Sequence, residues 1–118
     1  QFSMNNRTIW KWTAMIMQPE YVAAKMVAEA LDEVRKKKGS LALERVRFET
    51  YHEGLSAQIM HIGPYAAEEP TIARLHSFIR ESGYEQNGKH HEIYLSDPRR
   101  TAAEKLKTIL RQPICRRV

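Results

Sequence analysis

The segment from residue 88 to residue 98 constrains the fold more than any other part of the chain. It has the pattern of a strand that carries a carboxylate in its middle and ends at a turn. Because strand side chains alternate between faces, Ile93 and Leu95 are expected on one face, packed beneath helices. The other face would then carry His90, Glu92 and Tyr94. A carboxylate between an imidazole and a phenol suits a pocket, although a half-exposed antiparallel strand with a wet polar face fits the same pattern.

Length and composition limit the architecture. With 118 residues, of which 42% are hydrophobic, the chain can bury one modest core, so we expect a single domain. No apolar run approaches the roughly 20 residues that span a bilayer, and no signal-peptide pattern precedes the first expected strand. The single cysteine, Cys115, has no partner for a disulfide. These features predict a cytoplasmic protein that does not enter a membrane.

The formal net charge of +5 raises the question of nucleic-acid binding. The lysines at 36–38 close an expected helix just before Gly39, where cations oppose the negative end of the helix dipole. The arginine pairs at 99–100 and 116–117 are short and lie in no helix-turn-helix, zinc-finger or RNA-binding signature. The sequence therefore predicts no direct nucleic-acid partner.

Two elements are expected in the first third of the chain. Ile9–Met17 is rich in strand-forming residues and stops at Gln18-Pro19, which predicts a strand. Glu20–Lys38 repeats apolar residues at helical spacing and predicts an amphipathic helix that ends at Gly39.

A hairpin is predicted next. Its strands would be Val46–Phe48 and Leu55–Met60, and its turn would lie at residues 52–54. Gly54 suits that turn because glycine adopts a positive φ without steric cost.

The second half predicts one long helix and two further strands. Pro70 suits the first turn of the helix, because its missing N–H would be unpaired there, and Gly83 ends it. The buried stripe of this helix would be Ile72, Leu75, Phe78 and Ile79. Strands are expected at His90–Ser96 and around Thr108–Gln112, with a capping box at Thr101–Glu104 opening a short helix between them. The order of elements predicts an α+β fold with an antiparallel sheet and helices on one face.

Several short motifs extend this interpretation over nearly the whole chain. They are Trp10-Lys11-Trp12, His61-Ile62-Gly63-Pro64-Tyr65, Glu68-Glu69-Pro70, Arg74-Leu75-His76, Gly83-Tyr84, the run from Gly88 to Pro98, and Arg111-Gln112-Pro113. In order and spacing this set resembles the GyrI-like small-molecule-binding family. The resemblance implies two β-α-β-β units of the SHS2 type around a ligand groove. Residues 1–118 would form a single GyrI-like domain, as the C-terminal part of a longer two-repeat protein.

The resemblance also implies roles for particular side chains. Glu92 would lie at the floor of an aromatic groove, where a carboxylate neutralises a cation or acts as a general base toward water. Tyr94 or His90 would assist it by hydrogen bonding. The rings expected to bind a flat ligand are Trp10, Trp12 and Tyr65. The residues alone leave other interpretations open: a solvent-exposed glutamate, tryptophans in the core, and a loop tyrosine that packs locally.

The sequence gives little support for a metal site or for a nucleophilic catalytic residue. The adjacent His90 and His91 point to opposite faces of a strand, so they cannot bind one ion in a regular sheet. No cysteine pair or His-x-x-x-His pattern adds ligands, and the serines lack a glycine-flanked elbow. We expect no metal site and no cofactor.

The resemblance implies a protein that binds planar, hydrophobic small molecules, whether neutral or cationic. The run His90 to Asp97, HHEIYLSD, favours the branch that hydrolyses cyclopropane-containing genotoxic compounds. Two alternatives stay open: a non-catalytic ligand sensor, and a protein-binding module of the gyrase-inhibitor type, although the latter would expose an acidic or apolar docking surface and this chain is basic. An uncovered sheet edge leaves a homodimer open as well.

Overall fold

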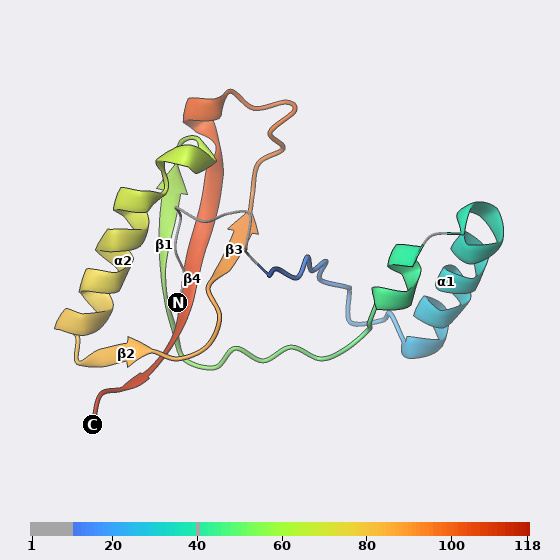
Figure 1. The fold of residues 1–118 in the computed structure, drawn as a ribbon, viewed down its shortest axis with the longest axis horizontal. Helices are drawn as coiled ribbons and strands as arrows, with labels where there is room; N and C mark the ends of the chain where they lie inside the picture. Colours follow the sequence, from blue (N-terminus) through green and yellow to red (C-terminus); the bar gives the residue numbers. More distant parts are fainter. Residues whose placement is uncertain (1–10, 40) are drawn as a thin grey trace. The chain divides into compact units, whose positions relative to one another are not determined.

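The computed structural model describes residues 11–39 and 41–118, which form two compact units. The first unit ends at Tyr51, and the second runs from His52 to Val118. Within the described residues the fold is mixed α+β, with two α-helices and a four-stranded antiparallel sheet (Figure 1). The predicted class, α+β with an antiparallel sheet, is therefore confirmed.

The first unit contains helix α1, Ala24–Lys38, and the short 3₁₀ helix η2, Leu41–Arg45. The predicted helix is thus confirmed, although it begins later than Glu20. It ends at Gly39, as predicted, where the backbone N–H of Gly39 donates to the carbonyl of Arg35 at 3.2 Å. No side chain of α1 is fully buried; within its apolar stripe Val27 and Leu31 are partly buried and Val34 is exposed.

Two strands predicted before residue 55 are absent from the part of the chain that the structure describes. Residues 11–17 and Val46–Phe48 have no strand structure. A strand persists only when its backbone N–H and C=O groups pair with a neighbouring strand, and no described strand pairs with either segment. Gly54 does adopt a positive φ of 72°, but the chain there enters the sheet from an irregular segment, so the predicted hairpin is wrong.

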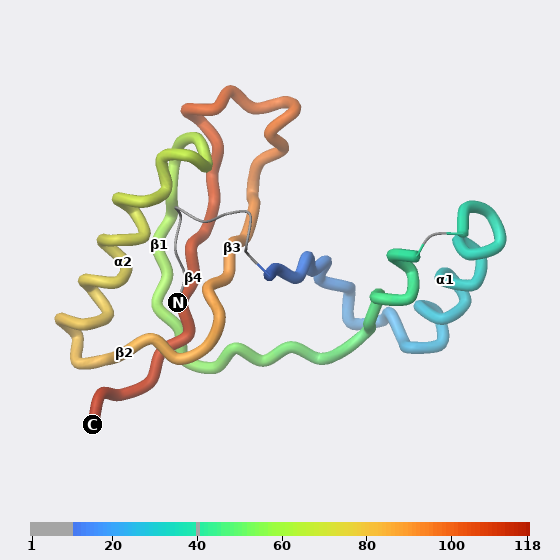
Figure 2. Tube along the Cα trace, in the orientation of Figure 1, coloured from blue at the N-terminus to red at the C-terminus, as the bar shows by residue number. Residues whose placement is uncertain are grey.

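The sheet lies in the second unit and is built around one long strand. Its strands are β1 (Ser56–Ile62), β2 (Tyr84–Gln86), β3 (His91–Tyr94) and β4 (Lys107–Arg116). β1 pairs with β4 in a register that sets Ser56 opposite Pro113, and β2 and β3 pair with successive stretches of β4. Figures 1 and 2 show β4 lying between β1 and β3. β4 continues past the predicted end at Gln112, and the carbonyl of Pro113 accepts the N–H of Asn87 at 2.8 Å.

Helix α2, Glu69–Glu81, covers one face of this sheet (Figure 1). Pro70 lies in its first turn, as predicted. The core combines three residues of α2 with two of the sheet: Ile72, Leu75, Ile79, Ala57 and Leu110. Phe78 was expected in the buried stripe but is exposed, because it lies at the border of the contact with the sheet rather than over its centre.

Two short 3₁₀ helices flank the sheet. η3, Tyr65–Ala67, leads from β1 into α2, and η4, Ala103–Lys105, precedes β4. The capping box predicted at Thr101–Glu104 is wrong, since η4 begins after Ala102 and has no side-chain cap. The backbone N–H of Thr101 instead donates to the carbonyl of Asp97 at 2.9 Å, which closes a turn after the β3 segment.

Candidate functional site

The register of β3 and β4 decides which way Glu92 points. Glu92 lies opposite Leu110, which is fully buried in the core beneath α2. Neighbours across a ladder share a face, so Glu92 lies on the face that α2 covers. The expectation that Ile93 and Leu95 would pack under the helices is therefore wrong. These two side chains belong to the opposite face, where Leu95 is exposed.

The three polar residues predicted on one face of this strand do meet. Nε2 of His90 lies 2.8 Å from Oε2 of Glu92, and the hydroxyl of Tyr94 donates to Oε1 of Glu92 at 3.2 Å. The side chain of His90 is 8% exposed and that of Glu92 is 15% exposed. Both carboxylate oxygens are thus held by donors.

A second carboxyl group, from Glu68, joins the cluster. Glu68 directly precedes α2 and is 2% exposed. Burial acts to raise the pKa of Glu92, but hydrogen bonds from His90 and Glu68, the charge of His90 and the Tyr94 hydroxyl together hold it below the ordinary value of 4.5. Glu92 is therefore ionised at neutral pH.

Tyr65 and Tyr94 form the aromatic part of the site. Their rings meet edge to face, with centroids 5.5 Å apart and an interplanar angle of 74°. Burial, followed by the charge of Glu92, raises the pKa of Tyr94 to about 12, so its hydroxyl remains a donor at neutral pH. Tyr94 is 61% exposed, which opens the site toward solvent on the side of this ring.

Two further polar groups lie at the buried end of the cluster. Burial lowers the pKa of His76, and the nearby His90 and Arg80 lower it further, so His76 is neutral at ordinary pH. Thr108 is opposite Tyr94 in the β3–β4 ladder and is fully buried. Among the described residues, neither Nε2 of His76 nor the hydroxyl of Thr108 has a hydrogen-bond partner.

Of the two tryptophans predicted to bind a ligand, the described residues include only Trp12. Trp12 belongs to the first unit, where its side chain is 79% exposed, and Trp10 lies outside the described residues. The structure thus brings together His90, Glu92, Tyr94 and Tyr65. Sequence reasoning missed Glu68 and His76, because a glutamate ahead of a proline is typical of a helix start and His76 lies within a helical run. The only sequence feature that could have indicated a role for them is that they belong to the motifs at residues 68–70 and 74–76.

A second cluster lies on the opposite face of β3. Oε1 of Glu53 is 2.8 Å from Nδ1 of His91, and Nη1 of Arg111 donates to Oε2 of Glu53 at 2.8 Å. Arg111 also donates to Gln58 at 2.9 Å. Burial acts to raise the pKa of Glu53, but the hydrogen bonds and charges of Arg111 and His91 hold it below its ordinary value. This cluster ties the segment before β1 to both β3 and β4.

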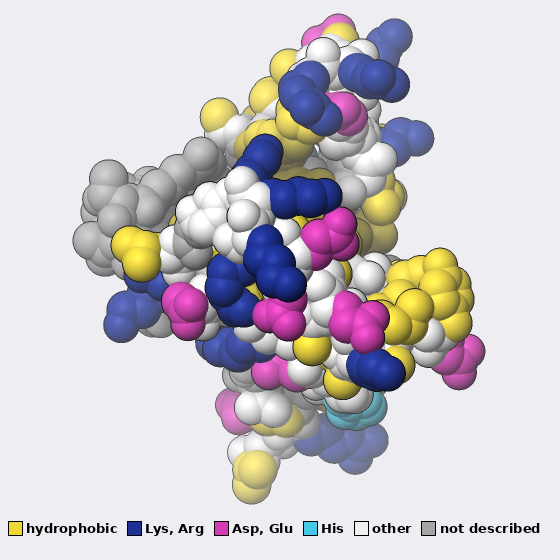
Figure 3. Space-filling view, turned by 90° about the vertical axis from the view of Figure 1, so that its right-hand side faces the viewer, with side chains coloured by type: hydrophobic (Ala, Val, Ile, Leu, Met, Phe, Trp, Pro, Cys, Tyr) yellow, Lys and Arg dark blue, Asp and Glu magenta, His cyan; other side chains and the backbone are white. Residues whose placement is uncertain are grey.

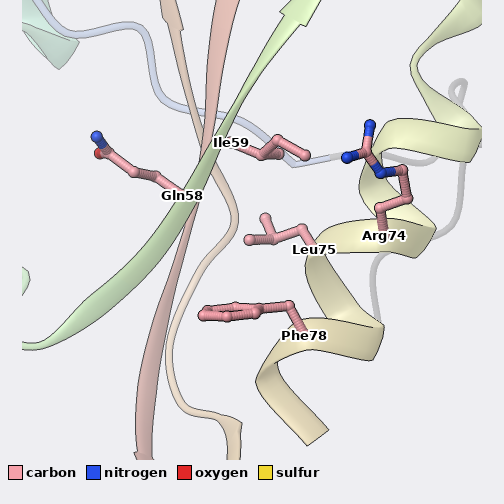
Figure 4. Close-up of a pocket in the computed structure, with 5 residues that line it drawn as sticks. All are labelled: Gln58, Ile59, Arg74, Leu75 and Phe78. Atoms are coloured by element: carbon pink, nitrogen blue, oxygen red, sulfur yellow. The ribbon is translucent and has the colours of Figure 1, made fainter. Parts of the chain in front are cut away.

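A hollow lies on the β1 side of α2 (Figure 4). It is lined by Gln58, Ile59, Arg74, Leu75 and Phe78. Figure 4 shows Ile59, Leu75 and Phe78 projecting between the strand and the helix, while Gln58 points away. None of the residues around Glu92 lines it. Among the described residues, no group of three His, Cys, Asp or Glu side chains is arranged to hold a metal ion.

Charges are mixed on the face seen in Figure 3, where Lys and Arg side chains are interspersed with Asp and Glu. No helix within residues 11–39 and 41–118 has the length and apolar character that crossing a membrane requires.

The fold is thus an α+β domain with one helix over its sheet and a largely buried carboxylate beside two tyrosines. The chain belongs to the GyrI-like family, because the model of the GyrI-like small molecule binding domain matches residues 8–114. A search of curated proteins found no match.

Solved structures agree with the family. A hydrolase from Listeria innocua is 39% identical with a TM-score of 0.72, and the match covers 83% of this chain and 52% of that one. An uncharacterized conserved protein from Listeria innocua is 41% identical with a TM-score of 0.76, covering 83% and 50%. A further solved structure, also of a hydrolase from this organism, is 39% identical, with a TM-score of 0.71 and coverage of 83% and 50%. The chain thus spans about half the length of the structures that it matches.

Proposed function

We propose that this protein binds planar, hydrophobic small molecules beside Glu92 and hydrolyses activated cyclopropane rings in genotoxic compounds of this kind. It would act as a detoxifying enzyme of the cytoplasm, with no cofactor. The observation that carries the proposal is the Glu92 carboxylate, which is charged, largely withdrawn from water and bordered by Tyr65 and Tyr94. Two of the matched Listeria innocua structures are described as those of a hydrolase, which gives further support.

The chemistry requires little from the protein beyond positioning and one base. In a cyclopropane fused to a dienone, the oxygen of a water molecule attacks a ring carbon and forms a new C–O bond. The strained C–C bond breaks, and its electron pair passes into the dienone, which becomes an aromatic phenolate. Glu92 accepts a proton from the attacking water, and the phenolate takes up a proton to give the phenol. The net reaction adds one water molecule to the substrate.

The neighbours of Glu92 have distinct parts in this scheme. His90 and Tyr94 fix the two carboxylate oxygens, so the base is oriented before the ligand arrives. The ring of Tyr65 and the exposed ring of Tyr94 offer apolar surface to a flat ligand. Trp12, and Trp10 outside the described residues, would add stacking surface.

The decisive experiment is the chemical fate of a cyclopropane-bearing alkylator incubated with the protein in ¹⁸O-labelled water. We expect a ring-opened product that carries one labelled oxygen in its new hydroxyl group, detected by mass spectrometry, and far less of this product with Glu92→Gln. Tight binding of unchanged compound would contradict the hydrolase and leave the ligand sensor. Absence of both binding and product would overturn the whole proposal.

A further inference from the structure

β1 forms an open edge of the sheet. Among the described strands it lies at one end of the strand order and pairs with β4 alone. The N–H of Gly63 donates to the carbonyl of Leu106 at 2.8 Å, and the N–H of Ile114 donates to the carbonyl of Leu55 at 2.9 Å. Because backbone groups alternate in direction along an antiparallel strand, the odd-numbered residues of β1 face β4. The backbone groups that point away from the sheet are those of the even-numbered residues Ser56, Gln58, Met60 and Ile62.

This edge has none of the usual protection against pairing with another strand. Natural proteins shield an exposed edge with charged side chains, proline, a bulge or a very short strand. β1 has seven residues, SAQIMHI, and contains no Lys, Arg, Asp, Glu or Pro. Its register with β4 runs from Ser56 to Ile62 without a bulge. The edge is therefore ready to accept a further strand.

Apolar side chains flank the edge on both faces of the sheet. Ile59 lies opposite Leu110 and so faces α2, which leaves Met60 and Ile62 on the other face. Met60 is 42% exposed and Ile62 is 62% exposed. On the α2 face, Phe78 is 60% exposed and lines the hollow between β1 and α2 (Figure 4). A strand added beside β1 would cover these side chains with its own, which alternate between the same two faces.

The hollow has the size of one side chain. Its volume is about 240 Å³. A cavity of about 150 Å³ is large enough for benzene, whereas pockets for drug-sized ligands begin at about 300 Å³. Ile59, Leu75 and Phe78 project into the space between the strand and the helix (Figure 4). The hollow therefore suits an apolar side chain of a bound segment better than a whole small molecule.

Arg74 adds a charge at the rim of the hollow. Its guanidinium is exposed and forms no hydrogen bond or ion pair with any described residue. Arg74 and Phe78 are four residues apart, which is about 6 Å along a helix. Alternate residues of a strand are about 6.7 Å apart. Because α2 runs alongside β1 (Figure 1), an extended segment with an apolar side chain in the hollow would bring its side chain two positions away to Arg74.

We propose that β1 and α2 form a docking groove for an extended segment of another protein. The segment adds a strand to β1, places an apolar side chain in the hollow and, two positions away, presents a carboxylate to Arg74. A second copy of this chain is a poorer occupant, because pairing of two β1 strands brings a second Arg74 to the groove instead of a carboxylate. The formal net charge of +5 on each copy opposes it further. None of the residues around Glu92 lines the groove, so the inference does not depend on the proposed hydrolysis.

The preferred segment is identified with a displayed library of short random peptides selected on the full chain. We expect the selected peptides to carry an apolar residue and an Asp or Glu two positions apart, among residues that favour strands. Hydrogen exchange of ¹⁵N-labelled protein then locates the binding. Without peptide, the amides of Ala57, Ile59 and His61 should be protected by β4. The outward amides of Gln58, Met60 and Ile62 should exchange rapidly and become protected when the peptide binds.

Variants at exposed positions test the two side-chain contacts. Phe78→Ala removes one wall of the hollow and should weaken binding of the selected peptide by about tenfold. Arg74→Gln should weaken it by about two- to fivefold, as for an exposed ion pair. This second loss should vanish for a peptide in which glutamine replaces the acidic residue. Leu95→Ala and Arg100→Gln, at exposed residues outside the groove, are the matched controls and should bind the peptide normally.

Several results would overturn the proposal. One is a library that yields no binding peptide, and another is binding that leaves the outward amides of β1 in rapid exchange. Protection of these amides without peptide would also reject it. Such protection would assign the edge to a second copy if it grows with protein concentration, and to the chain itself if it does not.

Discussion

Glu92 lies directly opposite Leu110 in the β3–β4 ladder, so an ionised carboxylate and a fully buried leucine share the face that α2 covers. An uncompensated charge in such a place would be strongly destabilising. Here His90 and Tyr94 donate to the carboxylate, one to each of its oxygens. The polar cluster therefore forms a continuation of the core at the edge of the sheet, beside the exposed ring of Tyr94.

Replacement of Glu92 by glutamine separates catalysis from binding. The amide keeps the size and one acceptor but cannot take a proton at neutral pH. We expect ring opening to fall by about 10²- to 10⁴-fold, the usual contribution of a general base, while the affinity for a neutral ligand changes little. Product formation and binding are measured separately, with the exposed Glu81→Gln as control. Unaltered turnover would remove Glu92 from the mechanism, and weakened binding of cationic ligands alone would make it a counterion.

The ionisation of Tyr94 reports on its contact with Glu92. Burial and then the charge of Glu92 raise the pKa of the phenol from 10.0 to about 12. Glu92→Gln removes the charge but not the burial, so the phenol should ionise at lower pH, still above 10.0. The ultraviolet absorbance of tyrosinate measures this, and the difference from Tyr94→Phe identifies the signal among the five tyrosines. An ionisation pH unaffected by Glu92→Gln would mean that the contact does not exist in solution.

The cluster of Glu53, His91 and Arg111 should make stability depend on pH. Because the pKa of Glu53 is lowered on folding, its stabilisation is present above the ordinary value of 4.5 and is lost as the pH falls through the folded-state pKa. At pH 7 we expect Glu53→Gln to lower the free energy of unfolding by about 1–3 kcal/mol, as for hydrogen bonds to charged groups. Urea unfolding of both proteins from pH 7 to pH 3 should show the difference shrinking below pH 4.5. A difference that stays constant with pH would exclude ionised Glu53 as its source.

Core substitutions test which face of β3 and β4 is buried. Leu110→Ala leaves a cavity beneath α2 and should cost about 2–5 kcal/mol of unfolding free energy. Leu95→Ala, at an exposed side chain beyond β3, should change it by less than about 0.5 kcal/mol. Equal losses, measured by chemical denaturation, would contradict the observed orientation of the strand.

Trp12 tests the stacking part of the proposal. If its exposed indole binds a flat ligand, addition of that ligand should quench or shift tryptophan fluorescence. Trp12→Ala should weaken binding by about 1–3 kcal/mol, as for an anchoring aromatic side chain, and Trp12→Phe should restore part of the loss. Affinity that is the same in both variants would assign Trp12 to another role.

The sequence alone was sufficient for features that depend on neighbouring residues. Gly39 predicted a helix end and Pro70 predicted a helix start, and both lie where expected. Glycine lacks a side chain and proline lacks a backbone N–H, and each property affects only the backbone around the residue itself. The period of two also placed His90, Glu92 and Tyr94 on one side of a strand, since alternation follows from the covalent geometry of an extended chain.

Only the tertiary structure decided which side that was. Alternation is the same whichever face is buried, and the choice depends on the pairing of β3 with β4 and on α2, which are distant in the sequence. Tertiary structure also decided that residues 11–17 and 46–48 are not strands. Their residues favour strands, but no described strand pairs with them. Tyr65, in the turn from β1 into α2, meets Tyr94 of β3, and no local pattern in the sequence predicts this meeting of distant segments. Sequence therefore determined the chemistry carried by β3, and long-range packing determined which groups surround it.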